Sequence, residues 1–380
     1  MVSTSVDAAG VRAECFSSAV LAEGRVVAIG GEDNGPPCSV EQTNLGAIYD
    51  PIANTWTPLS APSGWTYIGN APNVVLPDGQ LLVGNFDSTQ IARLDPVTLT
   101  WTNLNSTGKA DSNNEETWTL LPDGTVLTVD IAAAPQSERY FPQTDTWEPA
   151  GNTVAPLITN WVDSGGTVMG PSMLRPNGTV FVAGSTGHTV VYNVATGAWA
   201  AGPDFPVSDA QQSADGNAPG AVLPSGHVLV EATFYDPYAD TFFFEFDGTH
   251  LNPVPGPPYG SQNPADITKF LLLPSGQVLY ASGGNVLNLY TPGGSADSAW
   301  APTIASAPSM VQPGLTYPIT GTQFNGLSQA VSLGGDYEAA TNYPLIRIVN
   351  TATGHAFYCR TQRLARHLRR LSRPPAPACR

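Results

Sequence analysis

Charged residues, lysine and long apolar runs are scarce in this chain of 380 residues. Charged side chains make up 12% of the sequence, about half of the usual share, and only two of them are lysines. No run approaches the roughly 18 consecutive apolar residues of a membrane-spanning helix, so no transmembrane segment is expected. The motifs G-x-S-x-G, H-E-x-x-H and the P-loop are absent, so the chain lacks these signatures of hydrolases, zinc proteases and nucleotide-binding enzymes.

Cysteine is also rare, and its spacing fits no metal-binding motif. The four cysteines stand at 15, 38, 359 and 379. Cys15 and Cys38 fall in the same sequence repeat, where a disulfide in an exported protein and two free thiols are both open. The composition indicates an extracellular or cell-surface protein. Since MVSTSVDAAG has no signal-peptide character, export would require a different start from the one shown.

Basic residues are concentrated at the end of the chain. The last 21 positions hold 7 of the 15 basic residues and no acid. The remainder has 8 basic residues against 31 acidic ones, a net charge of −23. A body of this charge repels nucleic acid and anionic membranes, so neither is an expected partner.

Glycine and proline are abundant, with 38 and 35 copies, and they recur in a regular turn. The stretch WTLLPDGTVLTVD at 118–130 reads as a β-hairpin, in which Pro122 and Asp123 form the bend and Gly124 accepts the positive φ that follows. Similar turns end at five further glycines, so that successive turns are 45 to 55 residues apart. These glycines are Gly24, Gly79, Gly178, Gly226 and Gly276.

A second pattern keeps step with the turns. Each repeat continues with a strand that ends in a turn and an aromatic residue, as in YDPIANTW ending at Trp56 and YFPQTDTW ending at Trp147. Six repeats of about fifty residues, each with four strand-sized runs, are typical of the blades of a β-propeller. We expect the Tyr and Trp of each repeat to fill the space between neighbouring blades.

These motifs resemble the Kelch repeat, in which a strand ending in Gly-Gly precedes a Tyr-Asp-Pro turn and a Trp. RVVAIGG at 25–31, followed by YDPIANTW at 49–56, is a close match. Repeats 2 to 5 have LLVGN, VLTVD, VFVAG and VLVEA where the double glycine would stand. The resemblance covers residues 12–300 and implies an all-β fold with a six-bladed propeller. The chain resembles a bacterial Kelch-type propeller related to the central domain of galactose oxidase.

A relation to galactose oxidase also implies a copper-radical site, which the sequence does not support. Such a site needs two tyrosines, two histidines and a cysteine cross-linked to tyrosine, with one tyrosine directly before a histidine. No histidine of this chain follows a tyrosine. Neither copper nor any other metal or cofactor is therefore predicted, and no D-x-D-x-D-G calcium loop occurs.

The pattern changes after the sixth repeat. Residues 301–359 include QPGLTYPITGTQF, which resembles the start of an IPT/TIG immunoglobulin-like domain, but a full sandwich needs about 100 residues. We therefore expect an incomplete Ig-like β-sandwich. The basic tail at 360–380 has three interpretations: a basic amphipathic segment, a disordered extension, or sequence read in a shifted frame. The abrupt change in composition favours the third.

Polar residues lead into the first strand of several repeats. Nine positions before the turn glycine stand Asn70, Glu115 and Asn217, and both lysines of the chain lie in lead-in segments. The hypothesis places these groups at the channel mouth or on one face of the propeller, whereas the alternative is that they are solvated loop residues or strand caps. The predicted ligand-binding set is Asn70, Asp111, Glu115, Glu116, Asp215, Asn217, Asp266 and Lys269.

The favoured function is that of an exported, monomeric, non-enzymatic binding or scaffold protein that presents propeller loops to a protein or glycan. The alternative is a carbohydrate-active enzyme, because the chain resembles six-bladed Kelch propellers of the sialic acid mutarotase type. In that case Glu115 or Glu116 would be the acid–base group and Lys269 its charge partner. Neighbours on a strand point to opposite faces, so only one of the two carboxylates would face a substrate.

Overall fold

A computed structural model gives the fold of the chain. It describes residues 16–32, 42–158, 168–208, 211–212, 217–233, 241–258, 267–282, 285–334, 339–340, 344–363 and 377–379. No α-helix occurs among these residues, which form β-strands joined by turns. The predicted all-β class is confirmed. No helix that could span a membrane is found in the described part of the chain.

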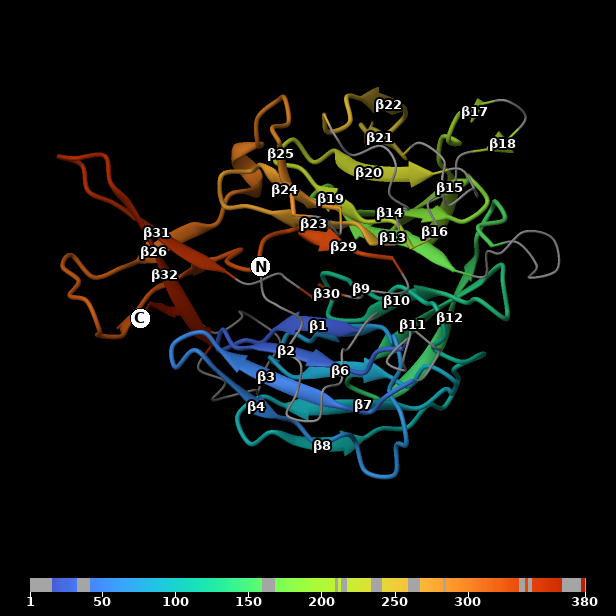
Figure 1. The fold of residues 1–380 in the computed structure, drawn as a ribbon, viewed down its shortest axis with the longest axis horizontal. Helices are drawn as coiled ribbons and strands as arrows, with labels where there is room; N and C mark the ends of the chain where they lie inside the picture. Colours follow the sequence, from blue (N-terminus) through green and yellow to red (C-terminus); the bar gives the residue numbers. More distant parts are fainter. Residues whose placement is uncertain are drawn as a thin grey trace.

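Six antiparallel sheets, called blades 1 to 6 in chain order, stand around a common centre (Figure 1). Blades 1 to 3 consist of β1 (Ser17–Val20), β2 (Val26–Ile29), β3 (Gly46–Asp50) and β4 (Thr55–Pro58); β5 (Asn73–Val75), β6 (Leu81–Gly84), β7 (Ile91–Asp95) and β8 (Thr100–Asn103); β9 (Thr119–Leu120), β10 (Val126–Val129), β11 (Gln136–Phe141) and β12 (Thr146–Asn152). Blades 4 to 6 consist of β13 (Met169–Leu174), β14 (Thr179–Gly184), β15 (Thr189–Asn193) and β16 (Ala198–Ala201); β19 (Gly220–Val222), β20 (Val228–Thr233), β21 (Thr241–Phe246) and β22 (Leu251–Val254); β23 (Lys269–Leu272), β24 (Val278–Ala281) and β25 (Leu287–Tyr290). The hairpin of β17 (Val207–Ser208) and β18 (Gln211–Gln212) extends the connection after blade 4. The predicted six-bladed propeller is confirmed.

The repeated turn joins the first two strands of each blade, as predicted. In blade 3, Gly124 has φ +85° and donates its N–H to the carbonyl of Leu121 at 2.9 Å. The Asp123 carboxylate accepts from the N–H and the hydroxyl of Thr125. A local bond network therefore fixes the strand register, which in turn decides which side chains face the neighbouring blade.

The aromatic pairs pack in two directions. Within blade 4, Tyr192 and Trp199 are paired across β15 and β16, with ring centroids 4.9 Å apart. The Trp199 indole also donates to Ser137 Oγ at 3.0 Å and to the carbonyl of Ala150 at 3.2 Å, both in blade 3. A tryptophan thus joins its own blade to the preceding one, which is the packing role expected for these residues.

Blade 6 differs from the prediction of four strands. Among the described residues of this blade, β23, β24 and β25 are paired, and the run before Trp300 ends in a 3-10 turn at Ser298–Trp300 instead of a strand. The turn brings the Trp300 ring against Gly226, where a Cβ would lie 2.7 Å from the ring. The connection from Tyr290 is long and contains Gly293 and Gly294, so its aromatic residue reaches the neighbouring hairpin instead of pairing with β25.

Two short strands from the segment after the sixth repeat lie in the middle of the propeller (Figure 1). β29 (Val331–Ser332) pairs with β19 of blade 5, and β30 (Ala339–Ala340) pairs in parallel with β1 of blade 1. Ser332 also accepts from the N–H of Ser172 in blade 4. The C-terminal part of the chain therefore connects blades that are far apart in sequence, a feature that the sequence patterns did not indicate.

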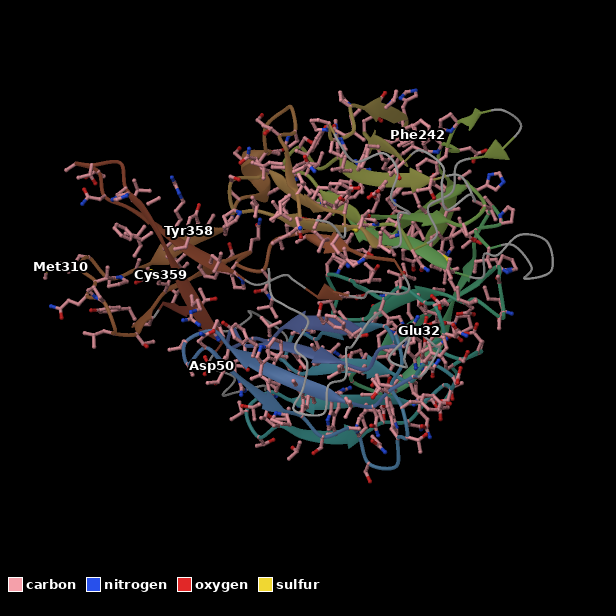
Figure 2. The ribbon with its side chains drawn as sticks, viewed as in Figure 1. Glu32, Asp50, Phe242, Met310, Tyr358 and Cys359 are labelled. Carbon is pink, nitrogen blue, oxygen red and sulfur yellow. The ribbon has the colours of Figure 1, made fainter. Side chains whose placement is uncertain are left out.

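The remaining C-terminal strands lie to one side of the propeller (Figure 1). They are β26 (Thr303–Ser306) paired with β28 (Thr320–Thr322), and a sheet of β27 (Tyr317–Pro318), β33 (Pro377–Cys379), β32 (Ala356–Arg363) and β31 (Leu345–Val349). Figure 2 shows Met310 and Tyr358 on this part, and both side chains are exposed. Cys359 is a free thiol. The Ig-like assignment and the boundaries at 301, 359 and 360 remain predictions, and the rest of the tail lies outside the described residues.

Candidate functional site

The lead-in segments of successive blades meet at one end of the inner strands. The N–H of Met169 donates to the carbonyl of Glu115 at 3.3 Å, and the N–H of Asn217 donates to the carbonyl of Met169 at 3.2 Å. These residues each precede the turn glycine of their blade by nine positions, so equivalent positions in blades 3, 4 and 5 are joined directly. Asn70, at the same position in blade 2, donates its side-chain amide to Glu115 at 3.2 Å.

The chain's own C-terminal segment occupies part of this end of the propeller. Gly334, with φ +71°, lies so close to Asn217 that a Cβ would come within 2.5 Å of its Cα. Glycine is needed here both for the backbone conformation and for the close approach. Asn217 itself is only 9% exposed, and Asn70 is fully buried.

The other predicted site residues are distributed over two blades. Lys269 begins β23 in blade 6, is half-buried, and donates its ammonium to the carbonyl of Thr268 at 2.8 Å. Asp215 and Asp266 lie outside the described residues. Asp111 and Glu116 belong to the interior of blade 3, so the structure brings them together with each other but gives them no solvated surface.

A single lysine organises this interior, which we call the blade 3 cluster: Lys109, Asp111, Glu116, Asp130 and Glu138. The Lys109 ammonium lies 2.6 Å from Glu116 Oε1, 2.8 Å from Asp111 Oδ1 and 3.1 Å from Glu138 Oε2. All five residues are buried. The strand β10 ends just before Asp130, and Glu138 stands on the adjacent β11, opposite Thr128.

Backbone and indole donors hold three of the four carboxylates. Asp111 accepts from the N–H of Ala132 at 2.7 Å, and Glu138 accepts from the N–H of Ala110 at 2.7 Å. Glu116 accepts from the Trp118 indole at 3.1 Å. The arrangement is rigid because each contact comes from a different strand or turn of the same blade.

Electrostatics within the cluster are strongly coupled. Burial alone would lower the pKa of Lys109, but the carboxylates of Glu116, Asp111 and Glu138 raise it above its ordinary value. Burial raises the pKa of Glu116 well above its usual range, despite the nearby ammonium. Burial, together with the charges of Glu138 and Asp111, raises the pKa of Asp130 to about 7. A buried group of four carboxylates thus has too little positive charge around it.

The predicted set contained two members of this cluster, Asp111 and Glu116, and it left out Lys109, Asp130 and Glu138. Asp130 could have been found by aligning the repeats on their turn glycines. Six positions after the turn glycine, the other blades have the uncharged residues Gly30, Asn85, Gly184, Ala232 and Ser282. A comparison of all six repeats at that position would have singled out Asp130.

The described histidines do not form a copper-binding group. His188 pairs with Asp204 at 2.8 Å and His227 with Glu245 at 3.1 Å, each within its own blade. His250 stands in the turn after β21, and His355 in the turn after β31. Among the described residues, the one group of three His, Cys, Asp or Glu ligands contains only carboxylates. The residues that the structure describes therefore do not fit the copper site that a relation to galactose oxidase implies.

Comparison with known proteins supports the architecture. No family model and no curated protein matches the chain. Among solved structures, the chain is similar to a fungal alcohol oxidase of the AA5 family in complex with copper, with a TM-score of 0.56 and 12% sequence identity. The match covers 92% of this chain and 90% of that chain. The likeness is one of fold. At this identity it assigns no activity to the chain.

Proposed function

We propose that the chain is a non-enzymatic binding protein whose propeller presents its loops to a protein or glycan partner. The observation that carries this proposal is that the polar side chains capable of acid–base chemistry are bonded to other residues of the chain. Glu116 and Asp111 are bound to Lys109 inside blade 3, and Asn70 is bound to Glu115. In the proposal these bonds hold the loops in place, whereas acid–base catalysis would require the same groups to reach a substrate proton.

The partner surface in this proposal is the end of the propeller where the inner strands begin. Glu115 and Lys269 are half-buried and, among the predicted residues that the structure describes, are best placed to contact a partner. The deeply buried Asn70, Asp111 and Glu116 hold the loops from within. Extracellular location and a monomeric state are parts of the same proposal.

The carbohydrate-enzyme alternative has no observation in its favour. Its acid–base pair would require a carboxylate that reaches a substrate together with Lys269. Glu116 is fully buried beside Lys109, and Glu115 and Lys269 belong to blades 3 and 6. An acid–base mechanism needs both groups within hydrogen-bond reach of one reacting atom.

A glycan array combined with an anomer-exchange assay on N-acetylneuraminic acid tests the proposal. We expect binding of at least one glycan without accelerated exchange, and weaker binding by the double variant Glu115→Gln, Lys269→Ala. Asp78→Asn is the matched control, since Asp78 lies in a turn at the opposite end of the inner strands and caps only the N–H of Gln80. Accelerated exchange by the wild type, lost in the double variant, would overturn the proposal.

A further inference from the structure

We propose that Asp111, Asp130 and Glu138 form a binding site for a divalent cation of the calcium type inside blade 3. The inference is independent of the partner-binding function. It rests on the positions of three carboxylates, on the hydrogen bonding of one of them, and on a comparison among the six blades.

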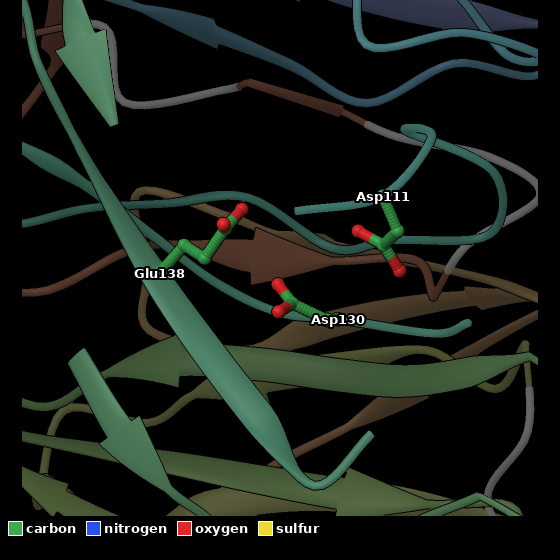
Figure 3. A group of neighbouring side chains, drawn as sticks. All are labelled: Asp111, Asp130 and Glu138. Atoms are coloured by element: carbon green, nitrogen blue, oxygen red, sulfur yellow. The ribbon is translucent and has the colours of Figure 1, made fainter. Parts of the chain in front are cut away.

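The three carboxylates converge on a common region (Figure 3). One oxygen from each of Asp111, Asp130 and Glu138 lies within 4.8 Å of the other two. Oxygen ligands lie about 2.3–2.6 Å from Ca²⁺, so two ligands of the same ion are separated by at most about twice that distance. The observed spacing is therefore compatible with one shared ion.

Asp130 is the member of the cluster that lacks a hydrogen-bond donor. Its side chain is 0% exposed, and both of its carboxylate oxygens are without a hydrogen-bond partner. The closest approach of the Lys109 ammonium is 4.0 Å from Oδ1, beyond hydrogen-bond length. Figure 3 shows this carboxylate directed toward the space between Glu138 and Asp111. A buried ionised carboxylate without donors is costly, so such a group either takes up a proton or binds a cation.

Charge balance leads to the same inference. The blade 3 cluster has one ammonium and four carboxylates, a formal charge of −3 when all are ionised. Burial of such a charge is costly unless protons or a cation compensate it. A divalent ion would reduce it to −1 and would supply Asp130 with the partner that Lys109 does not provide.

Comparison with the other blades shows that the fold itself does not require these acids. Glu138 is the cross-strand partner of Thr128 in blade 3. At the equivalent position the other blades have uncharged residues, which are Ala47, Ala92, Val190, Phe244 and Asn288. Where blade 3 has Asp130, they have the uncharged residues named above. The blade geometry forms with uncharged side chains at both positions, so the acids of blade 3 are a local addition. Departures from the pattern of a repeat are expected at functional sites.

A single buried carboxylate elsewhere in the propeller provides a contrast. Glu231 in blade 5 is also fully buried, but it accepts from the Thr268 hydroxyl at 2.6 Å and from the Tyr280 hydroxyl at 3.3 Å. Neutral donors thus satisfy both of its oxygens. In the blade 3 cluster the corresponding donors for Asp130 are absent among the described residues, as a ligand position requires.

The ligand set favours a hard ion. The three residues offer only carboxylate oxygens, which suit Ca²⁺ and Mg²⁺, whereas zinc and copper sites generally use histidine or cysteine. Ca²⁺ tolerates the irregular geometry of side chains from two loop positions and one strand position better than Mg²⁺, which demands a near-octahedral shell. Ca²⁺ is therefore the probe of choice.

Terbium luminescence tests the site in the full chain, because Tb³⁺ replaces Ca²⁺ and can be excited through a nearby tryptophan. The Trp147 ring lies 5.3 Å from the Lys109 ammonium, and Trp118 bonds to Glu116, so both indoles border the cluster. We expect saturable, tryptophan-excited Tb³⁺ emission that Ca²⁺ displaces, and a thermal midpoint that rises with Ca²⁺ and falls again with chelator.

Asp130→Asn should weaken Tb³⁺ and Ca²⁺ binding by at least about 10-fold, since even residues that only support ligands affect metal affinity by about 10- to 100-fold. Because this variant reduces buried charge, we expect it to fold, which circular dichroism checks. Glu231→Gln serves as the matched control, with a buried acid altered in blade 5 and emission unchanged. Absence of saturable emission from the wild type, or equal emission from Asp130→Asn, would overturn the site.

Discussion

Blade 3 and blade 5 share the same strand arrangement, but their interiors differ in the kind of side chain that fills them. In blade 5, apolar residues such as Phe244 and Ala232 fill the positions that Glu138 and Asp130 occupy in blade 3. The buried acid Glu231 of blade 5 instead accepts hydrogen bonds from two hydroxyl groups. The contrast teaches that the propeller specifies strand register and inter-blade packing, while the chemistry behind the inner strands varies freely from blade to blade.

Loss of the Lys109 ammonium should have the largest effect on the charged interior of blade 3. Lys109→Met leaves four buried carboxylates without their shared partner, and loss of one member of a buried ion pair costs about 3–5 kcal/mol. We expect a decrease of that size in the free energy of unfolding, measured by urea denaturation. Lys269→Met is the control, because Lys269 is half-buried and bonds to a carbonyl. Equal effects of the two variants would contradict a central role for Lys109.

An aspartate at position 232 of blade 5, which is equivalent to Asp130 of blade 3, tests whether an apolar interior accepts a carboxylate. Ala232 is fully buried among the apolar side chains of blades 4 and 5. Ala232→Asp therefore places a carboxylate among apolar side chains, and we expect the free energy of unfolding to fall by about 3 kcal/mol. Ala232→Asn separates the effect of charge from that of size, and it should be less damaging at neutral pH. An Asp variant as stable as the Asn variant would show that blade 5 can accept the charge without a partner.

An exposed carboxylate of blade 3 should respond much less. Partial burial of Asp123 opposes its ionisation, but hydrogen bonds from Thr125 and the charge of Arg139 prevail and lower its pKa below the ordinary value of about 3.9. A lowered folded-state pKa gives stability that is present above the unfolded-state pKa and is lost as pH falls through the folded-state pKa. Because the carboxylate is 52% exposed, we expect at most about 0.5 kcal/mol.

The measurement for this prediction is the stability difference between the wild type and Asp123→Asn from pH 7 down to pH 3. The difference should shrink as the solution is acidified below the ordinary aspartate range. A difference that grows with acidification would mean that the sign of the pKa shift is wrong.

The ring of blades could be predicted from the sequence because each repeat contains two independent patterns with the same period. The turn glycine fixes a hairpin, and the Tyr and Trp residues fix the outer strands, so that six blades could be counted before any coordinates. The same logic failed at Trp300, where a longer connection lets the aromatic residue pack on Gly226. β29 and β30 were not predicted because two-residue strands have no periodicity to detect.

The candidate site was predictable only in part. Asp111 and Glu116 were recognised because they stand in a polar lead-in segment, but they were expected on a surface and are buried. Asp130 and Glu138 stand beside or within ordinary strands, and nothing in one repeat alone marks them. Their convergence depends on pairing between β10 and β11 and on the path of the loop that carries Lys109. Such contacts arise from tertiary structure, which local sequence patterns do not encode.

A crystal structure of the full chain, grown with Ca²⁺ and measured for anomalous scattering, tests the contrast between the blades most directly. We predict one anomalous peak in blade 3, about 2.3–2.6 Å from oxygens of Asp111, Asp130 and Glu138, and none at the equivalent positions of the other blades. The contradictory result is an empty cluster in which the carboxyl groups of Asp130 and Glu138 lie about 2.5–2.7 Å apart and share a proton.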